Sequence, residues 1–247
     1  MIDKYKLYRG REIKLTDKII LKQPTLGQIM DFGEKDYLGV VHTMTASHMD
    51  ETSIVMLTKA GLDFNHVSDW ELFILSHGTI GEGTRLFFDN VDFSKLTVTS
   101  MNDCIVLSDN NGFIMDETLY KIIIMYIRAM NNIPAPKFKK VKDDPVQKRM
   151  AIEDAQNVVD SYIRKAKFQI EESSQLLPII SYLVAQPGFK HDERTVFNLS
   201  IYQFWDAVKR HLAINNAEHL YNGLYSGCLD LKKNPSLNKE MDVTREL

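Results

Sequence analysis

The spacing of apolar residues changes several times along the chain, and each change predicts a new element. Over residues 5–22, apolar and polar positions alternate on both sides of Gly10, which predicts a pair of strands, and a further apolar run closes this region. Over residues 26–44 the apolar side chains recur every three or four positions, which predicts a helix. Thr25 and Gln28 have the spacing of a capping box at its start, and the glycines inside it predict a kink or a break.

A hairpin and a long helix are the clearest signals in the middle of the chain. Shorter helical patterns over residues 50–60 and 68–78 precede them. Apolar runs on both sides of Asp109-Asn110-Asn111-Gly112 predict a β-hairpin, because Asn-Gly readily adopts positive φ. Asp116 then has the position of an N-cap for a helix whose apolar stripe is unbroken from Leu119 to Met130.

The remainder of the chain lacks strand patterns. Residues 131–145 hold three prolines and a basic run, which predicts a linker. A break is expected near Asn215-Asn216, and we expect the polar residues 230–247 to be frayed or extended. The periodicity between these points predicts helical segments over residues 146–170 and 176–185, a long helix from Ser200 to the break, and a further helix over residues 217–225.

These patterns predict an α+β protein that is predominantly α-helical. Short N-terminal strands and a β-hairpin combine with helices in the first part of the chain, and an all-α C-terminal part follows. The linker predicts a division into a mixed α+β domain over residues 1–131, a Pro/Lys-rich linker over 132–145, a helical domain over 146–229 and a polar tail over 230–247.

Composition excludes several classes of protein. With 247 residues, 44% of them hydrophobic, the chain is neither wholly disordered, nor a collagen-like fibre, nor a disulfide-rich miniprotein. The net charge of -3 gives no global basic field to attract nucleic acid. The apolar stretch at 122–127 is too short to span a bilayer and no signal-peptide pattern opens the sequence, so we expect a cytosolic protein. Cys104 and Cys228 are then expected to be free thiols, with Cys104 buried in a strand.

The motifs give no sign of a catalytic residue, a metal site or a cofactor. The seven histidines lack the spacing of zinc ligands, and the sequence has neither a nucleophile elbow nor a complete glycine-rich phosphate loop. Gly81-Glu82-Gly83 is expected to be a turn, and sequential acidic pairs such as Glu153-Asp154 a solvated helix face. We therefore expect a protein that is not an enzyme.

One run of basic residues in the linker could contact nucleic acid or an acidic partner. An aromatic residue, Phe138, lies within it, and two further basic residues at 148 and 149 bring the total to six positive charges. Because charge runs between prolines are more often solvated hinges, we favour that interpretation. The basic patch consists of Lys137, Lys139, Lys140 and Lys142.

Six short stretches in both halves of the chain carry a further signal. They are ILKQPTLGQI with FGEKDY (20–37), WELF (70–73), TRLFF (84–88), VDFSK (91–95), IYQFWDAVKR (201–210) and HLYNGLYSG (219–227). Together they resemble proteins encoded in the tail modules of phages and prophages of Gram-positive bacteria. The shared residues have packing and capping patterns rather than catalytic ones.

The resemblance implies a tail assembly chaperone. Such a protein would bind the tape-measure protein, the tail-tube protein or both in the cytoplasm of the bacterial host before the tube polymerises. It would need no cofactor and no membrane. A tape-measure protein exposes apolar helical stripes that aggregate until tube subunits enclose them. The partner-binding residues that we expect in the C-terminal part are Tyr202, Phe204, Trp205, Tyr221 and Tyr225.

Other interpretations stay open at this point. All five aromatic residues could be core residues, and for Phe204 and Trp205 the core is the favoured placement. The chain could also be a structural virion component, such as a tail-completion or connector protein, and self-association is compatible with either role. A less favoured alternative is a nucleic-acid-binding module that uses the basic patch, or a small enzyme with an unrecognised site.

Overall fold

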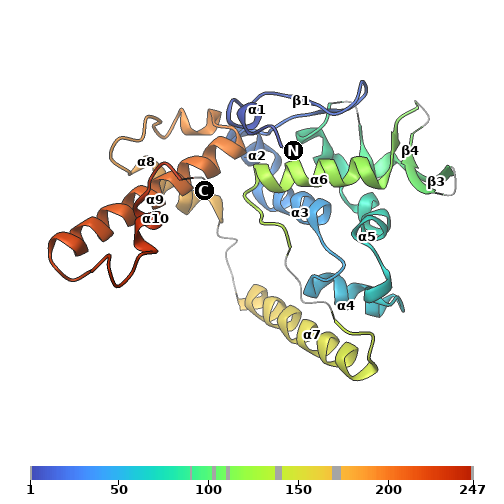
Figure 1. The fold of residues 1–247 in the computed structure, drawn as a ribbon. Coiled ribbons are helices and arrows are strands. Elements are labelled where there is room, and N and C mark those ends of the chain that lie inside the picture. The colour runs from blue at the N-terminus through green and yellow to red at the C-terminus, as the bar shows by residue number, and fades with distance from the viewer. Residues whose placement is uncertain are drawn as a thin grey trace.

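The computed structural model describes residues 2–89, 91–101, 104–109, 112–136, 141–168 and 174–245, and it confirms a predominantly helical α+β fold (Figure 1). The main helices are α1 (Lys4–Tyr8), α2 (Leu26–Phe32), α3 (Glu34–Thr45), α4 (Glu51–Lys59), α5 (Asp69–Ser76), α6 (Glu117–Met130), α7 (Pro145–Phe168), α8 (Leu176–Val184), α9 (Ile201–Tyr225) and α10 (Leu237–Met241). The strands are β1 (Ile13–Lys14), β2 (Ile20–Leu21), β3 (Thr97–Met101), β4 (Cys104–Ser108) and β5 (Ile114–Met115).

The predicted N-terminal strand pair is only partly correct. Residues 4–8 form α1 instead of a strand, because the Asp3 side chain accepts a hydrogen bond from Lys6 N and so caps a helical turn. Of the two apolar residues that suggested a strand over residues 5–8, Leu7 is buried, whereas Tyr5 is 86% exposed. The strand that does form, β1, pairs antiparallel with β2, the apolar run that closes this region.

Several local predictions are confirmed. Thr25 and Gln28 form the capping box of α2, and Gly33, at a φ of 107°, separates α2 from α3. Strands β3, β4 and β5 form one antiparallel sheet, and Asp116 caps α6 by accepting a hydrogen bond from Leu119 N. Two residues of the hairpin turn, Asn110 and Asn111, lie outside the described residues.

Most buried side chains belong to one core. It includes residues of α2, α3, α5 and α6 together with residues of α8 and α9. Aromatic rings meet within it: the ring centroid of Phe73 lies 4.7 Å from that of Tyr120 in a tilted arrangement and 6.0 Å from that of Phe93 in an edge-on arrangement. Apolar packing of this kind supplies most of the stability of a fold, so the helices before and after the linker stabilise one another.

A second, smaller core forms between α4 and α7 (Figure 1). Ala155 of α7 is buried there against Ile54, Val55 and Leu57 of α4. The first helix after the predicted linker therefore packs on a helix that lies well before it in the sequence. The domain division at the linker stays a prediction, but both cores contain residues from each side of it.

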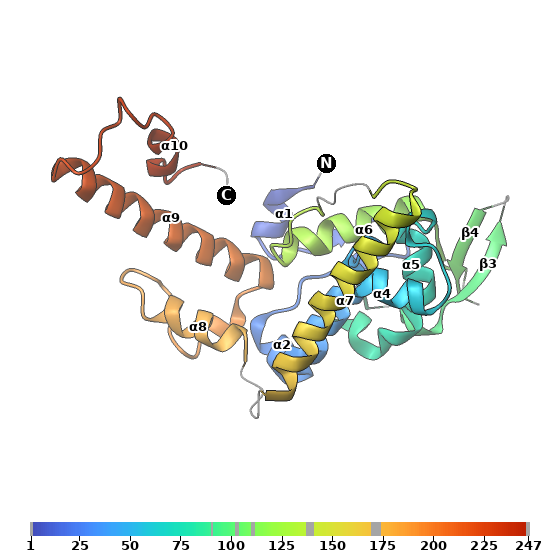
Figure 2. The ribbon, with the colours of Figure 1, turned by 90° about the horizontal axis from the view of Figure 1, so that it is seen from below.

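The C-terminal part differs from its prediction in two places. Helix α9 continues through Asn215-Asn216, where a break was expected, because Ala213 and Ala217 are buried on one side and Asn215 donates a hydrogen bond to the Tyr182 hydroxyl. The expectation of an extended tail is also wrong. Residues 237–241 form α10, which packs on α9 and buries Met241 (Figure 2).

The N-terminal ends of α2 and α9 are joined through their backbones. Thr25 and Ser200, the N-cap residues of the two helices, form an isolated antiparallel bridge. Its two flanking backbone hydrogen bonds, between residues 24–26 and 199–201, measure 2.9 and 3.0 Å. This contact places the helical C-terminal part directly against the start of α2.

We expect two glycine substitutions to change stability in opposite directions. A Cβ atom at Gly83 would lie 2.2 Å from Val40 Cγ2, so Gly83→Ala should lower the free energy of unfolding by about 1–3 kcal/mol. Gly39, inside α3, has open space at that position, so Gly39→Ala should raise it by about 0.5–1 kcal/mol. Urea denaturation of the two variants tests this, and equal shifts would contradict the packing at Gly83.

Candidate interaction surfaces

The five predicted contact residues lie in two different environments on α9. Phe204 is fully buried, and Tyr202 and Trp205 are partly buried against the main core. Near the other end of the helix, Tyr221 is 44% exposed and Tyr225 is 86% exposed. The structure therefore separates the candidates into a core group and an exposed pair.

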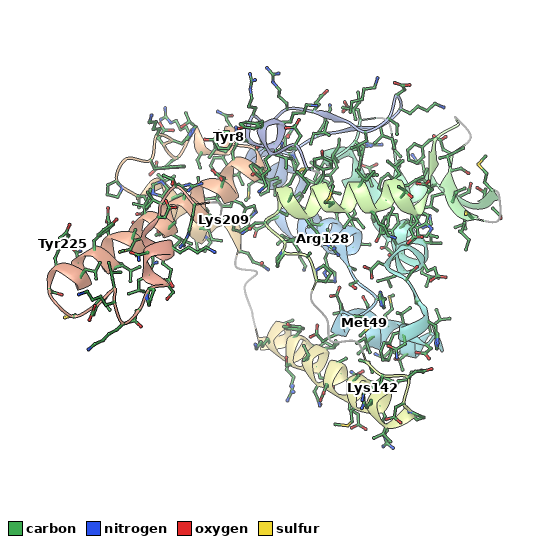
Figure 3. All side chains as sticks on the ribbon, in the orientation of Figure 1. Tyr8, Met49, Arg128, Lys142, Lys209 and Tyr225 are labelled. Carbon is green, nitrogen blue, oxygen red and sulfur yellow. The ribbon has the colours of Figure 1, made fainter. Side chains whose placement is uncertain are left out.

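The exposed pair has a defined geometry. Tyr221 and Tyr225 are one helical turn apart, and their ring centroids lie 6.5 Å apart at an interplanar angle of 24°. Figure 3 shows Tyr225 at the tip of α9, remote from Arg128 of α6. Aromatic side chains on a regular helix lose little conformational entropy on binding, which suits a contact surface for another protein.

The chain after α9 folds back along this helix and stabilises it. Leu229 N donates a hydrogen bond to Gly223 O at 3.0 Å, and a Cβ at Gly223 would meet the Leu229 side chain at 2.6 Å. Arg210 binds the far end of the returning segment, with Nη1 at 2.5 Å from Val243 O and 3.2 Å from Arg245 O. The tyrosine pair is thus presented by a helix that is held in place from one side.

The basic patch is only partly described. Lys137, Lys139 and Lys140 lie outside the described residues, and Lys142 is exposed just before α7. Of the two basic residues that follow, Lys148 is engaged in ion pairs within the chain. That ammonium group is therefore not available to a nucleic acid, and the patch has fewer free charges than the sequence count indicates.

Lys148 lies at the centre of a cluster of charged groups beside the α4–α7 contact. Its ammonium group lies 2.5 Å from Asp63 Oδ2 and also pairs with Asp143, while His66 Nδ1 lies 3.0 Å from the same Asp63 oxygen. The hydrogen bond from Lys148 holds the pKa of Asp63 at about 2, and the two carboxylates raise the pKa of Lys148. Asp63, His66 and Asp143 have the spacing of metal ligands, but the lysine already supplies the cation between the two carboxylates.

A second polar cluster joins the loop after α3 to the start of α5. Asp69 Oδ1 accepts hydrogen bonds from Ser47 Oγ and His48 N, each at 2.8 Å, and lies 2.6 Å from His48 Nδ1. Burial alone would raise the pKa of Asp69, but the bonds from His48 and Ser47 outweigh it and lower the pKa. Ser47 bonds the carboxylate and not the imidazole, so the three side chains are not ordered as a nucleophilic triad.

This cluster borders a groove of about 500 Å³ beside α6. Trp70, Tyr120 and Ile124 line it together with Arg128, whose Nη2 donates to Thr45 O at 2.6 Å. The groove combines an apolar wall with an imidazole and a guanidinium group, a composition that could hold a small ligand. No sequence signal marked it, because Ser47 and His48 are distant in sequence from Asp69 and α6.

The thiols are free but not buried. Cys104 and Cys228 are both exposed and form no disulfide. The prediction that Cys104 is buried is wrong, since β4 turns only its later residues, Val106 and Leu107, into the core. Among the described residues, no helix is long and apolar enough to cross a membrane.

A comparison with protein families finds a likeness for part of the chain. The family model described as the YomV second domain matches residues 169–239, a region that contains α8, α9, the start of α10 and both exposed tyrosines. This is a phage-type (Bacillus prophage) protein family, so the match supports a phage-associated protein. It covers under a third of the chain. No curated protein and no solved structure matches the chain.

We expect Lys148→Met to loosen the contact of α7 with α4 and to lower the free energy of unfolding near neutral pH, because Asp63 and Asp143 lose their shared cation. Because the pKa of Asp63 is about 2 in the folded protein and near 3.9 when unfolded, its stabilising contribution is present above about pH 4 and disappears as the pH falls towards 2. Denaturant unfolding of the wild type and of Lys148→Met at several pH values should show that the difference in their free energies of unfolding shrinks over that interval.

Arg149→Met is the matched control. Arg149 forms an exposed pair with Glu153 one turn along the same helix, with side chains 82% and 61% exposed. Its loss should have a smaller effect, of about 0.3–0.5 kcal/mol or less. An equal loss of unfolding free energy in the two variants, or a loss for Lys148→Met that does not depend on pH, would contradict the prediction. The Lys148 cluster would then stabilise the chain no more than an exposed ion pair does.

Proposed function

We propose that this chain is a non-enzymatic phage tail-morphogenesis protein that acts as an assembly chaperone. Its partner would be the tape-measure protein, the tail-tube protein or both, before the tail tube polymerises in the cytoplasm of the bacterial host. The observation that carries the proposal is the exposed pair Tyr221 and Tyr225 on the part of α9 that the phage-type family model covers.

The physical argument concerns what such a partner exposes. A tape-measure protein that is not yet enclosed presents long apolar helical stripes to solvent, and these aggregate unless another protein covers them. Two tyrosines one turn apart on a rigid helix offer apolar ring faces with polar hydroxyl tips. They can therefore cover an apolar stripe reversibly, as a helix packed against a helix.

A structural role in the virion is the second candidate, and the edge of the three-stranded sheet favours it. Strand β3 is at the edge of the sheet, and all five of its residues are exposed. Its sequence, TVTSM, has no charged residue and no proline, the features that usually prevent a sheet edge from pairing with another chain. Such an edge suits permanent assembly by strand addition.

We expect Tyr221→Ala together with Tyr225→Ala to abolish most of the capture of the tape-measure protein without lowering the melting temperature. Both rings are exposed at a helix end, so little packing is lost. A tagged pull-down from cells that produce the phage proteins, read by mass spectrometry, measures the capture. Enrichment of the tape-measure protein by the wild type, and its loss in the double variant, is the expected result.

Phe204→Ala is the control for folding. Phe204 is fully buried, and its truncation should cost about 3–5 kcal/mol and lower the melting temperature. If the wild-type chain captures neither tape-measure nor tube protein, the chaperone role is wrong. If the chain is instead found in mature virions, the structural role takes its place.

A further inference from the structure

The groove beside α6 has an aromatic end and a basic end. Tyr120, Ile124 and Arg128 line it at intervals of four residues, so they lie on one face of α6 over about 12 Å of helix. Trp70 of α5 adds to the apolar wall, and its ring centroid lies 5.1 Å from that of Tyr120. The apolar part of the wall therefore begins at Tyr120, and Arg128 stands two helical turns away from it.

The other charged side chains around the groove have partners that also line it. Lys121 Nζ lies 2.7 Å from Glu117 Oε1, and His48 Nδ1 lies 2.6 Å from Asp69 Oδ1. The Tyr120 hydroxyl donates a hydrogen bond to the backbone oxygen of Asp69 at 3.0 Å. Each of the two carboxylates in the lining is thus matched by a basic group of the same groove.

The Arg128 guanidinium group, by contrast, bonds to a neutral partner. Its Nη2 donates to Thr45 O at 2.6 Å, and Arg128 is half-buried. Among the residues that the structure describes, no carboxylate pairs with Arg128, and its buried Nε has no hydrogen-bond partner. A positive charge beside an apolar wall is weakly screened by water, so it favours an anionic group at this end of the groove.

We infer that this groove binds a small, elongated carboxylate, whose apolar body lies along Trp70, Tyr120 and Ile124 and whose carboxylate group lies on Arg128. A guanidinium group can bind a carboxylate through two N–H donors at once, which selects this anion over a neutral hydroxyl group. The groove volume of about 500 Å³ suits a small ligand. Figure 3 shows Arg128 remote from Tyr225, so the site is separate from the tyrosine pair and does not depend on the chaperone role.

Three probes of closely similar length test the inference on the full chain. They are 6-phenylhexanoate, 6-phenylhexan-1-ol and 6-phenylhexylamine, which share an apolar body and differ in their end group. Isothermal titration calorimetry at low salt should show that the carboxylate binds at least about tenfold more tightly than the alcohol, and that the amine binds most weakly. Equal binding of the carboxylate and the alcohol, tighter binding of the amine, or binding of none of them would overturn the inference.

A negative charge placed in the groove locates the site. Met125 lines the groove and is 36% exposed, so Met125→Glu should leave the fold intact and weaken the binding of 6-phenylhexanoate about tenfold or more by repulsion. Leu212→Glu on α9 is the control, because Leu212 is 54% exposed, lies outside the lining of the groove, and the change adds the same charge. An equal loss in the control, or no loss in Met125→Glu, would overturn the site.

Removal of the guanidinium group tests the recognition of the carboxylate. Arg128→Met should bind 6-phenylhexanoate no more tightly than the alcohol, and a preference that survives would contradict the role of Arg128. If this variant does not fold, the NMR signals of the two indole N–H groups in the wild type decide. The carboxylate probe should shift the signal of Trp70 and leave that of Trp205 on α9 in place, and the reverse would overturn the site.

A short peptide that ends in phenylalanine tests whether the carboxylate belongs to a protein chain. We expect it to bind more weakly than 6-phenylhexanoate, because its peptide groups would lose water against the apolar wall. If the peptide instead binds tenfold more tightly, and its C-terminal amide does not bind, the groove holds the end of a protein chain and the inference of a small ligand is wrong.

Discussion

The backbone bridge between Thr25 and Ser200 is the contact on which the arrangement of the chain most depends. Both residues are N-caps, so one short pairing fixes the start and direction of two helices from opposite ends of the sequence. Two glutamine side chains then attach α1 to the same point: Gln23 Nε2 donates to Leu7 O and Gln203 Nε2 to Tyr8 O, each at 2.9 Å. These bonds attach carbonyl groups at the end of α1 to residues beside the N-caps of α2 and α9.

A consequence of this junction is that the chain between α6 and α8 must leave the main core and return to it. Helix α7 lies in this segment between α6 and α8. It is stabilised outside the main core by its contact with α4 and by the Lys148 cluster. Because α4 is short, it covers only part of the apolar face of α7. The exposure of Tyr162 and Ile163, which lie on α7 beyond α4, is thus a result of the mismatch in length between two packed helices.

Local signals in the sequence predicted the fold well, whereas contacts between distant residues did not follow from it. The capping box at Thr25 depends on residues three apart and forms as predicted, and Ser68 and Ser200 form capping boxes of the same spacing. The predicted pairing of β1 with residues 5–8 was wrong, since β1 pairs with β2. Strand pairing depends on contacts beyond the local pattern. Asn215-Asn216 indicated a break, but packing against α8 and the returning tail overrides that local preference.

The exposure of the candidate contact residues also depends on contacts between distant parts of the chain, which the sequence pattern does not predict. The sequence places five aromatic residues on α9, and only the tertiary contacts decide which of them reach solvent. They are Tyr202, Phe204, Trp205, Tyr221 and Tyr225. Tyr162 and Ile163 of α7 are a harder case, since they have the periodicity of a core face and are exposed because α7 continues beyond the end of α4.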